Sequence, residues 1–214
     1  MDHRLLGFFS GFPNHRFPRD VAKRLIEELT HRDSLVFVSA WPEDHARNDS
    51  DATGMHSMFE EYSIPFARRY VIDYRTEASH AIRLVYEASC VFLMGGHPGQ
   101  QLQLIRDLNL EAAIFNANTA VLGVSAGAIN MAERSLDTKN SIVPYDGLGL
   151  ADITVKPHFE IDDQPVLSTL LQISMELPIC AMEDNSAIFV ADDSISYTGQ
   201  IHWVSKGKIS PLSQ

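Results

Sequence analysis

Basic residues are scarce in this sequence. Lysine and arginine contribute 17 of the 214 residues, against 28 aspartates and glutamates, so the formal net charge is −11 at pH 7. Proteins that bind nucleic acids or anionic membranes usually carry clusters of positive charge that neutralise phosphate groups. We therefore expect neither a nucleic acid nor a membrane among the partners of this protein.

Cysteines and long apolar runs are also rare. Cys90 and Cys180 both lie in apolar stretches, which predicts buried thiols in a reducing compartment rather than a disulfide. No apolar run approaches the ~18 residues of a membrane-spanning helix. The apolar segment near the start is broken by Gly7 and Gly11, and it is too short for a signal peptide. These features predict a soluble cytoplasmic protein.

The overall composition is that of an ordinary globular protein. Hydrophobic residues make up 45% and charged residues 21%, which excludes a disordered, collagen-like or coiled-coil chain. A chain of this length can bury roughly 70% of the surface that its unfolded form exposes. No linker, repeat or low-complexity segment interrupts it, so we expect one domain over residues 1–214.

The first 150 residues alternate between short apolar runs and segments with helical spacing. This alternation predicts βαβ units, and hence an α/β fold with a mostly parallel sheet and helices on both faces. The expected strands are 5–9, 35–40, 70–74, 90–94 and 119–124, and the expected helices are 19–29, 78–85 and 99–108. The polar segment 41–58 is expected to be a surface excursion.

The pattern changes after residue 150. Strand-like runs at 153–155, 179–182, 187–190 and 195–204 accompany only one good helix, at 165–175. The turn signals Thr198-Gly199 and Lys206-Gly207 predict a terminal antiparallel hairpin. We therefore expect a small antiparallel portion at the C-terminal end.

The strongest chemical signal is a G-x-S-x-G pattern at residues 123–127, directly after an apolar strand and before a helix start rich in small residues. A serine on such a sharp strand-to-helix turn exposes its hydroxyl, and the small neighbours leave room for the turn. Ser125 is therefore the expected nucleophile, and the Ala126 amide could stabilise an oxyanion. The glycine turn at residues 95–99 could also aim N–H groups at an oxyanion, although it could equally be a plain strand–helix connection.

A serine nucleophile needs a base that a third group orients. Among nine histidines, His158 is favoured because it follows a strand directly, and His97 in the glycine turn is the alternative. Spacing alone leaves the acid open among Asp137, Glu160 and Glu183. The sequence has no Walker loop, dinucleotide fingerprint or clustered zinc ligands, so we expect no cofactor and no metal.

Three segments together resemble a known family. They are L-M-G-G at 93–96, L-G-V-S-A-G-A at 122–128 and K-P-H-F at 156–159, and their order resembles that of the dipeptidase E group of serine peptidase family S51, which includes cyanophycinase. The resemblance runs from about residue 30 to about residue 205. It implies a class I glutamine amidotransferase-like three-layer sandwich.

The resemblance also implies roles for individual residues. Ser125 would be the nucleophile, His158 the general base, and the amides of Gly96 and Ala126 the oxyanion donors. For the acid we rank Glu183 first, since residues 181–184 resemble the Glu-containing segment of the cyanophycinase branch. Asp137 ranks second, because an acid shortly after the nucleophile has been proposed in the family. Glu160, two residues after the histidine as in the amidotransferase relatives, ranks third.

The expected function is a serine peptidase that hydrolyses small peptides through an acyl-enzyme, with a homodimer as a candidate assembly. Dipeptidase E cleaves dipeptides with an N-terminal aspartate and carries arginines after P-H-F, whereas residues 161–174 here contain no basic residue. The sequence therefore does not support an aspartyl preference. The alternatives are a non-catalytic or regulatory member of the fold, or an esterase. The short spacing from Ser125 to His158 disfavours an α/β-hydrolase esterase.

Overall fold

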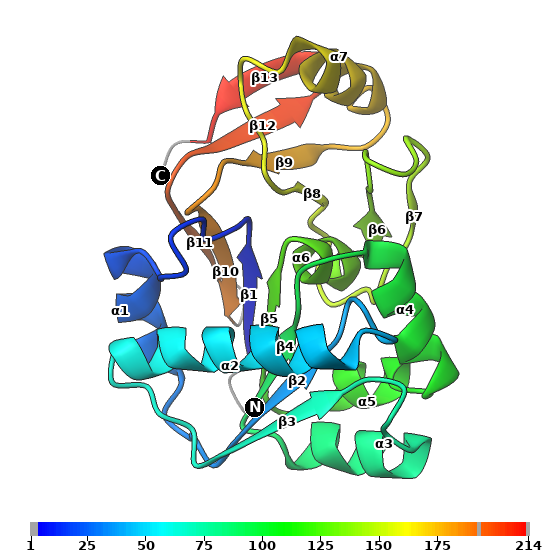
Figure 1. Ribbon diagram of the computed structural model, residues 1–214. Coiled ribbons are helices and arrows are strands. Elements are labelled where there is room, and N and C mark those ends of the chain that lie inside the picture. Colours follow the sequence, from blue (N-terminus) through cyan, green and yellow to red (C-terminus); the bar gives the residue numbers. More distant parts are fainter. Residues whose placement is uncertain (1–3, 192–193, 213–214) are drawn as a thin grey trace.

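The computed structural model describes residues 4–191 and 194–212. Its largest element is a seven-stranded sheet with the strand order β11-β10-β1-β5-β4-β2-β3 (Figure 1). Five neighbouring strands of this sheet, in the order β1-β5-β4-β2-β3, are parallel to one another, as predicted. These strands are β1 (Leu5–Phe9), β2 (Ser34–Val38), β3 (Arg68–Ile72), β4 (Cys90–Leu93) and β5 (Ala120–Val124).

Helices cover both faces of this sheet (Figure 1). One face packs against α1 (Arg19–Glu28) and α2 (His45–Glu61). The other face packs against α3 (Ala78–Glu87), α4 (Pro98–Asp107), α5 (Glu111–Asn116) and α6 (Ala126–Met131). The predicted three-layer α/β arrangement is therefore confirmed. Among the described residues, no helix combines the length and apolar character needed to cross a membrane.

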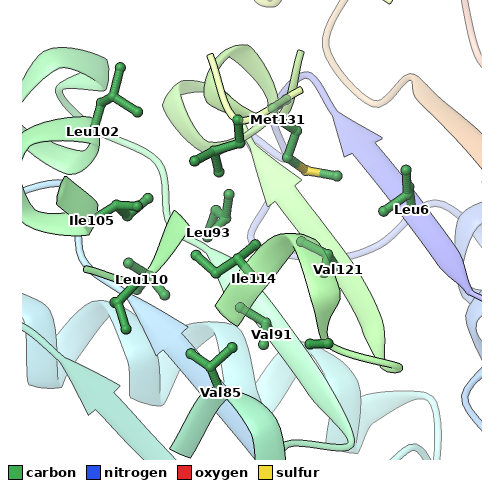
Figure 2. Close-up of a cluster of buried hydrophobic side chains, with 14 of the residues drawn as sticks. Leu6, Val85, Val91, Leu93, Leu102, Ile105, Leu110, Ile114, Val121 and Met131 are labelled. Atoms are coloured by element: carbon green, nitrogen blue, oxygen red, sulfur yellow. The ribbon is translucent and has the colours of Figure 1, made fainter. Parts of the chain in front are cut away.

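Alternation along the central strands divides the core between the two helical layers. In β4, Val91 and Leu93 point toward α3–α6, where Figure 2 shows them beside Ile114, whereas Cys90 and Phe92 face the α1–α2 side. All four side chains are buried. A parallel strand buried on both faces is apolar at every position, which is why β4 and β5 read as continuous hydrophobic runs.

A second, four-stranded sheet lies beyond one end of the first (top of Figure 1). It joins β8 (Val155–Lys156), β9 (Ile179–Met182), β12 (Ile201–Ser205) and β13 (Lys208–Pro211), with α7 (Gln164–Ile173) packed on it. β8 and β9 are parallel and the other pairs are antiparallel. The expected terminal hairpin is present, because β12 and β13 turn at Lys206-Gly207, both with positive φ.

The expected strand at 195–204 is wrong as a single element. Its first half is β11 (Ser194–Thr198), which pairs with β10 (Ala187–Ala191) at the edge of the large sheet, and β10 pairs antiparallel with β1. Its second half is β12 in the small sheet. Gly199, with a φ of +75°, carries the chain from one sheet to the other. Turn signals locate such a change of direction without telling which sheet the next strand joins.

The expected surface excursion at 41–58 is also wrong, because most of it belongs to α2. The Asp44 side chain caps this helix by accepting a hydrogen bond from the Arg47 N–H at 3.2 Å. Asn48 is buried, and its side chain is hydrogen-bonded to those of Ser39 and Asp73. Besides Asn48, this helix buries only Ala52, Met58 and Phe59, which are too few to form the apolar stripe that makes a helix recognisable in a sequence. A short pair, β6 (Arg134–Ser135) and β7 (Tyr145–Asp146), was also not foreseen.

Both cysteines are buried and free, as expected. Burial in apolar surroundings raises the pKa of each thiol, and it raises that of Cys180 to about 12. Both therefore stay protonated at neutral pH.

Candidate active site

The carboxyl ends of three neighbouring strands meet at one edge of the large sheet. Ser10 follows β1, the glycine turn at 95–99 follows β4, and Ser125 follows β5. The small sheet adds two residues at the same place, because His158 comes shortly after β8 and Asp184 shortly after β9. Parallel sheets collect their functional groups at this edge.

Ser125 occupies a strained turn. Its φ is +51° and its ψ −108°, and its N–H donates to the Phe9 carbonyl at 2.9 Å. A non-glycine residue adopts a positive φ at an energetic cost, and it persists there when its surroundings hold it. A Cβ atom at Gly127 would overlap the Leu93 carbonyl, so the glycine of the motif lets α6 approach β4. The predicted elbow conformation is present.

Two hydrogen bonds join Ser125 to a carboxylate through the His158 ring. The ring Nε2 lies 2.9 Å from the Ser125 Oγ, and Nδ1 lies 2.7 Å from the Asp184 Oδ1. An ionised carboxylate only accepts hydrogen bonds, so Nδ1 carries the proton and Nε2 is free to accept from the serine hydroxyl. This is the tautomer in which a histidine can remove a proton from a nucleophile.

Asp184, and not Glu183, contacts the His158 ring. The Glu183 Oε1 instead lies 2.8 Å from the Nε2 atom of His202. The first-ranked acid is therefore wrong, and the physical reason is strand alternation. Ile179 and Ala181 face α7 while Cys180 and Met182 face the large sheet, and Glu183 continues the face of Ile179 and Ala181, away from Ser125. Asp184 lies in the turn after β9, and its carboxylate reaches the His158 ring.

The other two acids are also wrong as orienting groups. Asp137 is buried, and its carboxylate accepts from the Lys139 N–H at 3.2 Å and from the Asn140 side-chain amide at 2.6 Å. It therefore holds the loop that follows it. Glu160 is exposed. Neither is hydrogen-bonded to the His158 ring, whose two nitrogens are already engaged.

His97, the alternative base, has another contact. Its Nδ1 accepts from the Gln100 N–H at 3.3 Å and caps the start of α4. Its ring meets that of Trp41 edge-on, with 6.0 Å between the ring centroids. His158 is therefore the histidine that the structure places against Ser125.

Gly96 lines the same cavity as Ser125, and Ala126 follows Ser125 in the chain. Within the described ranges, neither N–H has a hydrogen-bond acceptor. Gly96 has a φ of +143°, and a Cβ atom there would overlap the indole nitrogen of Trp41. Only glycine therefore fits this turn. Two unengaged amides beside a nucleophile are what an oxyanion site needs.

A cavity of about 280 Å³ opens at Ser125 and His158, and the loop after Asp137 forms one wall. Lys156 lines it too, although only 6% of this residue is exposed. Its Nζ donates to the Pro157 carbonyl at 2.5 Å, and burial lowers the pKa of the ammonium group. Over residues 4–191 and 194–212, no group of three or more histidine, cysteine, aspartate or glutamate side chains could hold a metal ion.

Comparison with known proteins identifies the family of the chain. The family model described as peptidase family S51 matches residues 19–198. The chain belongs to peptidase family S51. The match confirms the resemblance seen in the sequence, and with it the assignment to the peptidases. No curated protein matches the sequence.

Two solved structures show the same fold as this S51 chain. The crystal structure of a peptidase from an acI-B1 Actinobacterium has a TM-score of 0.75 and 16% identity, covering 98% of this chain and 93% of that one. A peptidase E-like protein from Listeria monocytogenes EGD-e has a TM-score of 0.65 and 18% identity, covering 92% and 98%. At these identities the likeness shows a shared α/β architecture.

Sequence reasoning missed three residues at this S51 site, namely Asp184, Ser10 and Gly11. The Ser10 hydroxyl accepts from the His158 N–H at 2.7 Å and donates to the Met182 carbonyl at 3.0 Å. A Cβ atom at Gly11 would overlap the His158 ring and lie 2.6 Å from the Asp184 Oδ1. The only signal in the sequence was position, because Ser10 and Gly11 directly follow a predicted parallel strand.

Proposed function

We propose that this protein is a serine peptidase that hydrolyses small peptides through Ser125, His158 and Asp184. One observation carries the proposal, namely the continuous hydrogen-bonded chain from the Ser125 Oγ to the Asp184 carboxylate at a nucleophile elbow. Nucleophile, base and orienting acid in this geometry are the parts that acyl transfer to serine requires.

In the first half of the reaction, the Ser125 Oγ attacks the scissile carbonyl while His158 Nε2 takes the hydroxyl proton. The carbonyl oxygen gains negative charge, and the N–H groups of Gly96 and Ala126 stabilise it. Asp184 keeps the ring in the productive tautomer and balances the positive charge of the imidazolium. The tetrahedral intermediate collapses when His158 gives the proton to the leaving amine, which leaves an acyl group on Ser125.

In the second half, water takes the place of the amine. His158 removes a proton from this water as it attacks the acyl carbonyl, and the same N–H groups stabilise the second oxyanion. Collapse of this intermediate returns the proton to the Ser125 Oγ and releases the carboxylic acid product. The enzyme is thereby restored without an external reductant, metal or cofactor in the balance.

The dimensions of the site support a short substrate. A cavity of about 280 Å³ has room for a few side chains rather than an extended polypeptide. The loop at residues 137–140 lies along one wall of it. We therefore assign small peptides as the substrate class.

A fluorophosphonate probe tests the nucleophile without a known substrate. The serine oxygen forms a bond to phosphorus, fluoride leaves, and the base takes the hydroxyl proton. We expect the wild-type protein to be labelled on Ser125, Ser125→Ala to resist labelling, and Ser57→Ala, which changes an exposed serine on α2, to label like the wild type. A dipeptide library then identifies substrates. Equal labelling of Ser125→Ala and wild type would disprove the proposal.

A further inference from the structure

Besides the pair of His158 and Asp184, the structure contains a second histidine–carboxylate pair, His202 and Glu183. The Glu183 Oε1 is 2.8 Å from the Nε2 atom of His202, and both residues are mostly buried. Glu183 precedes Asp184 in the chain, and Phe159 follows His158. The Phe159 ring meets the His202 ring edge-on, with 5.3 Å between the centroids. Phe159 and Glu183, the chain neighbours of His158 and Asp184, therefore both contact His202.

Glu183 is anchored at its backbone as well as at its side chain. Its N–H donates to the Gln200 carbonyl at 3.0 Å, and its own carbonyl accepts from the Ser186 hydroxyl at 2.5 Å. In the orientation that satisfies its hydrogen bonds, the Gln200 side-chain amide donates to the Glu183 Oε2 at 2.8 Å. Glu183 thus ties the end of β9 to the beginning of the neighbouring strand β12 and to the residue that precedes it.

Asp184, in contrast, has few contacts of its own. Its side chain is 37% exposed. Apart from His158, the only hydrogen-bond partner of the Asp184 carboxylate in the described residues is the Ser10 hydroxyl, at 3.4 Å, which is the long end of a hydrogen bond, and the Gly11 backbone lies close to the same oxygen. The direction of this carboxylate is therefore set mainly by the backbone of the turn at 183–186.

We propose that Glu183 and His202 are a positioning pair that holds Asp184 against His158. The inference rests on the proposed function. Because Glu183 is held by its side chain at His202 and by its backbone at Gln200 and Ser186, the start of the turn from which Asp184 reaches the His158 ring is held as well. Glu183 and His202 do not touch the reacting atoms. Glu183 acts through Asp184, and His202 acts through Glu183 and through its ring contact with Phe159, next to His158.

A purely structural role would have a different consequence. If the pair only stabilised the small sheet, its loss would lower the free energy of unfolding and leave the folded protein fully reactive. If it positions Asp184, the folded protein itself reacts more slowly. Displacement of a catalytic group by about 1 Å can slow a reaction by about 100-fold.

The experiment compares variants by their rate of fluorophosphonate labelling at a temperature where all are folded. We expect Glu183→Ala and His202→Ala to label about 10- to 100-fold more slowly than wild type. Glu183→Gln keeps an acceptor for His202 and should recover a rate within a few-fold of wild type. Val204→Ala, which removes buried volume from the same small sheet, is the matched control and should lose stability but no reactivity.

Proton NMR gives a second readout. The His158 Nδ1 proton, assigned by its loss in Asp184→Asn, should be seen downfield in wild type and be lost or broadened in Glu183→Ala. Wild-type labelling rates in both alanine variants would overturn the inference, as would equal slowing in Val204→Ala. Failure of the proposed function has a separate signature, which is labelling of wild type and Ser125→Ala at the same rate.

Discussion

The carboxylates of Glu183 and Asp184 lie on opposite sides of the chain, although the residues are neighbours. The Asp184 Oδ1 is 2.7 Å from His158 Nδ1, and the Glu183 Oε1 is 2.8 Å from His202 Nε2. Each histidine therefore has its own acid. The structure thus distinguishes the acid that contacts His158 from the acid that contacts His202, which spacing along the chain did not distinguish.

The first prediction concerns these two acids. Asp184→Asn should preserve folding and lower turnover by about 10⁴-fold, because an amide favours the wrong tautomer of His158. Glu183→Gln should lower turnover only a few-fold. Rates of dipeptide hydrolysis, or of fluorophosphonate labelling, measure the difference. Equal effects of the two substitutions would contradict the assignment of Asp184 as the orienting acid.

Ser10 is hydrogen-bonded to the backbone of His158, the proposed general base. Its hydroxyl accepts from the N–H of His158, a residue held at a φ of +53°. Ser10→Ala leaves the partly buried His158 N–H without its partner, whereas the Met182 carbonyl keeps the hydrogen bond from the Phe159 N–H at 2.9 Å, so we expect a loss of about 1 kcal/mol in the free energy of unfolding. Urea denaturation measures this loss. Since the strained His158 backbone is then less restrained, labelling of Ser125 should slow as well, and an unchanged rate would argue against a supporting role.

Two glycines provide a matched pair of alanine substitutions. Gly11→Ala would place a methyl group against the His158 ring and the Asp184 carboxylate, and it should disrupt their contact and slow labelling strongly. Gly54 lies inside α2, and nothing lies within 4 Å of a Cβ atom there. Gly54→Ala should therefore raise the free energy of unfolding by about 0.5–1 kcal/mol. Labelling of this second variant should match the wild type.

Local patterns predicted most of the large sheet and the nucleophile, whereas long-range relations were not visible in the sequence. The strand at 5–9 and the elbow at Ser125 follow from apolar runs and small residues close together in the chain. The pairing of β10 with β1 depends on residues about 180 positions apart, which no local pattern specifies. The choice of acid failed for a related reason. Both faces of β9 are apolar, so alternation showed that residues 183 and 184 diverge but not which of them faces Ser125.

Alkylation of the two cysteines tests whether a thiol, and not Ser125, is the nucleophile. Cys90 and Cys180 are buried, and burial raises the pKa of both thiols. The thiolate is the reactive form, so iodoacetamide should leave the native activity unchanged. Mass spectrometry should find both thiols unmodified until the protein is unfolded. Rapid inactivation with one alkylated cysteine would contradict a serine nucleophile.

Lys156 predicts a pH-dependent change in stability. Burial lowers the pKa of its ammonium group below the ordinary value of 10.5, since the charged form is poorly solvated beside the cavity. Below the folded-state pKa, both the folded and unfolded chains are protonated, and the full cost of burying the charge is present. Between the folded-state pKa and 10.5, the unfolded chain binds more protons, so the stability of the wild type rises with pH in this window.

Lys156→Met removes this cost. The Pro157 carbonyl borders the cavity and can bond to water after the substitution. The variant should exceed the wild type in free energy of unfolding at neutral pH by on the order of 1 kcal/mol. The gain should shrink as the pH approaches 10.5, because the wild-type lysine is then neutral when folded. Urea denaturation of both proteins between pH 7 and about pH 10 measures this difference. A gain that stays constant across the range, or a variant less stable than wild type at neutral pH, would show that the buried charge is not what destabilises the protein at this position.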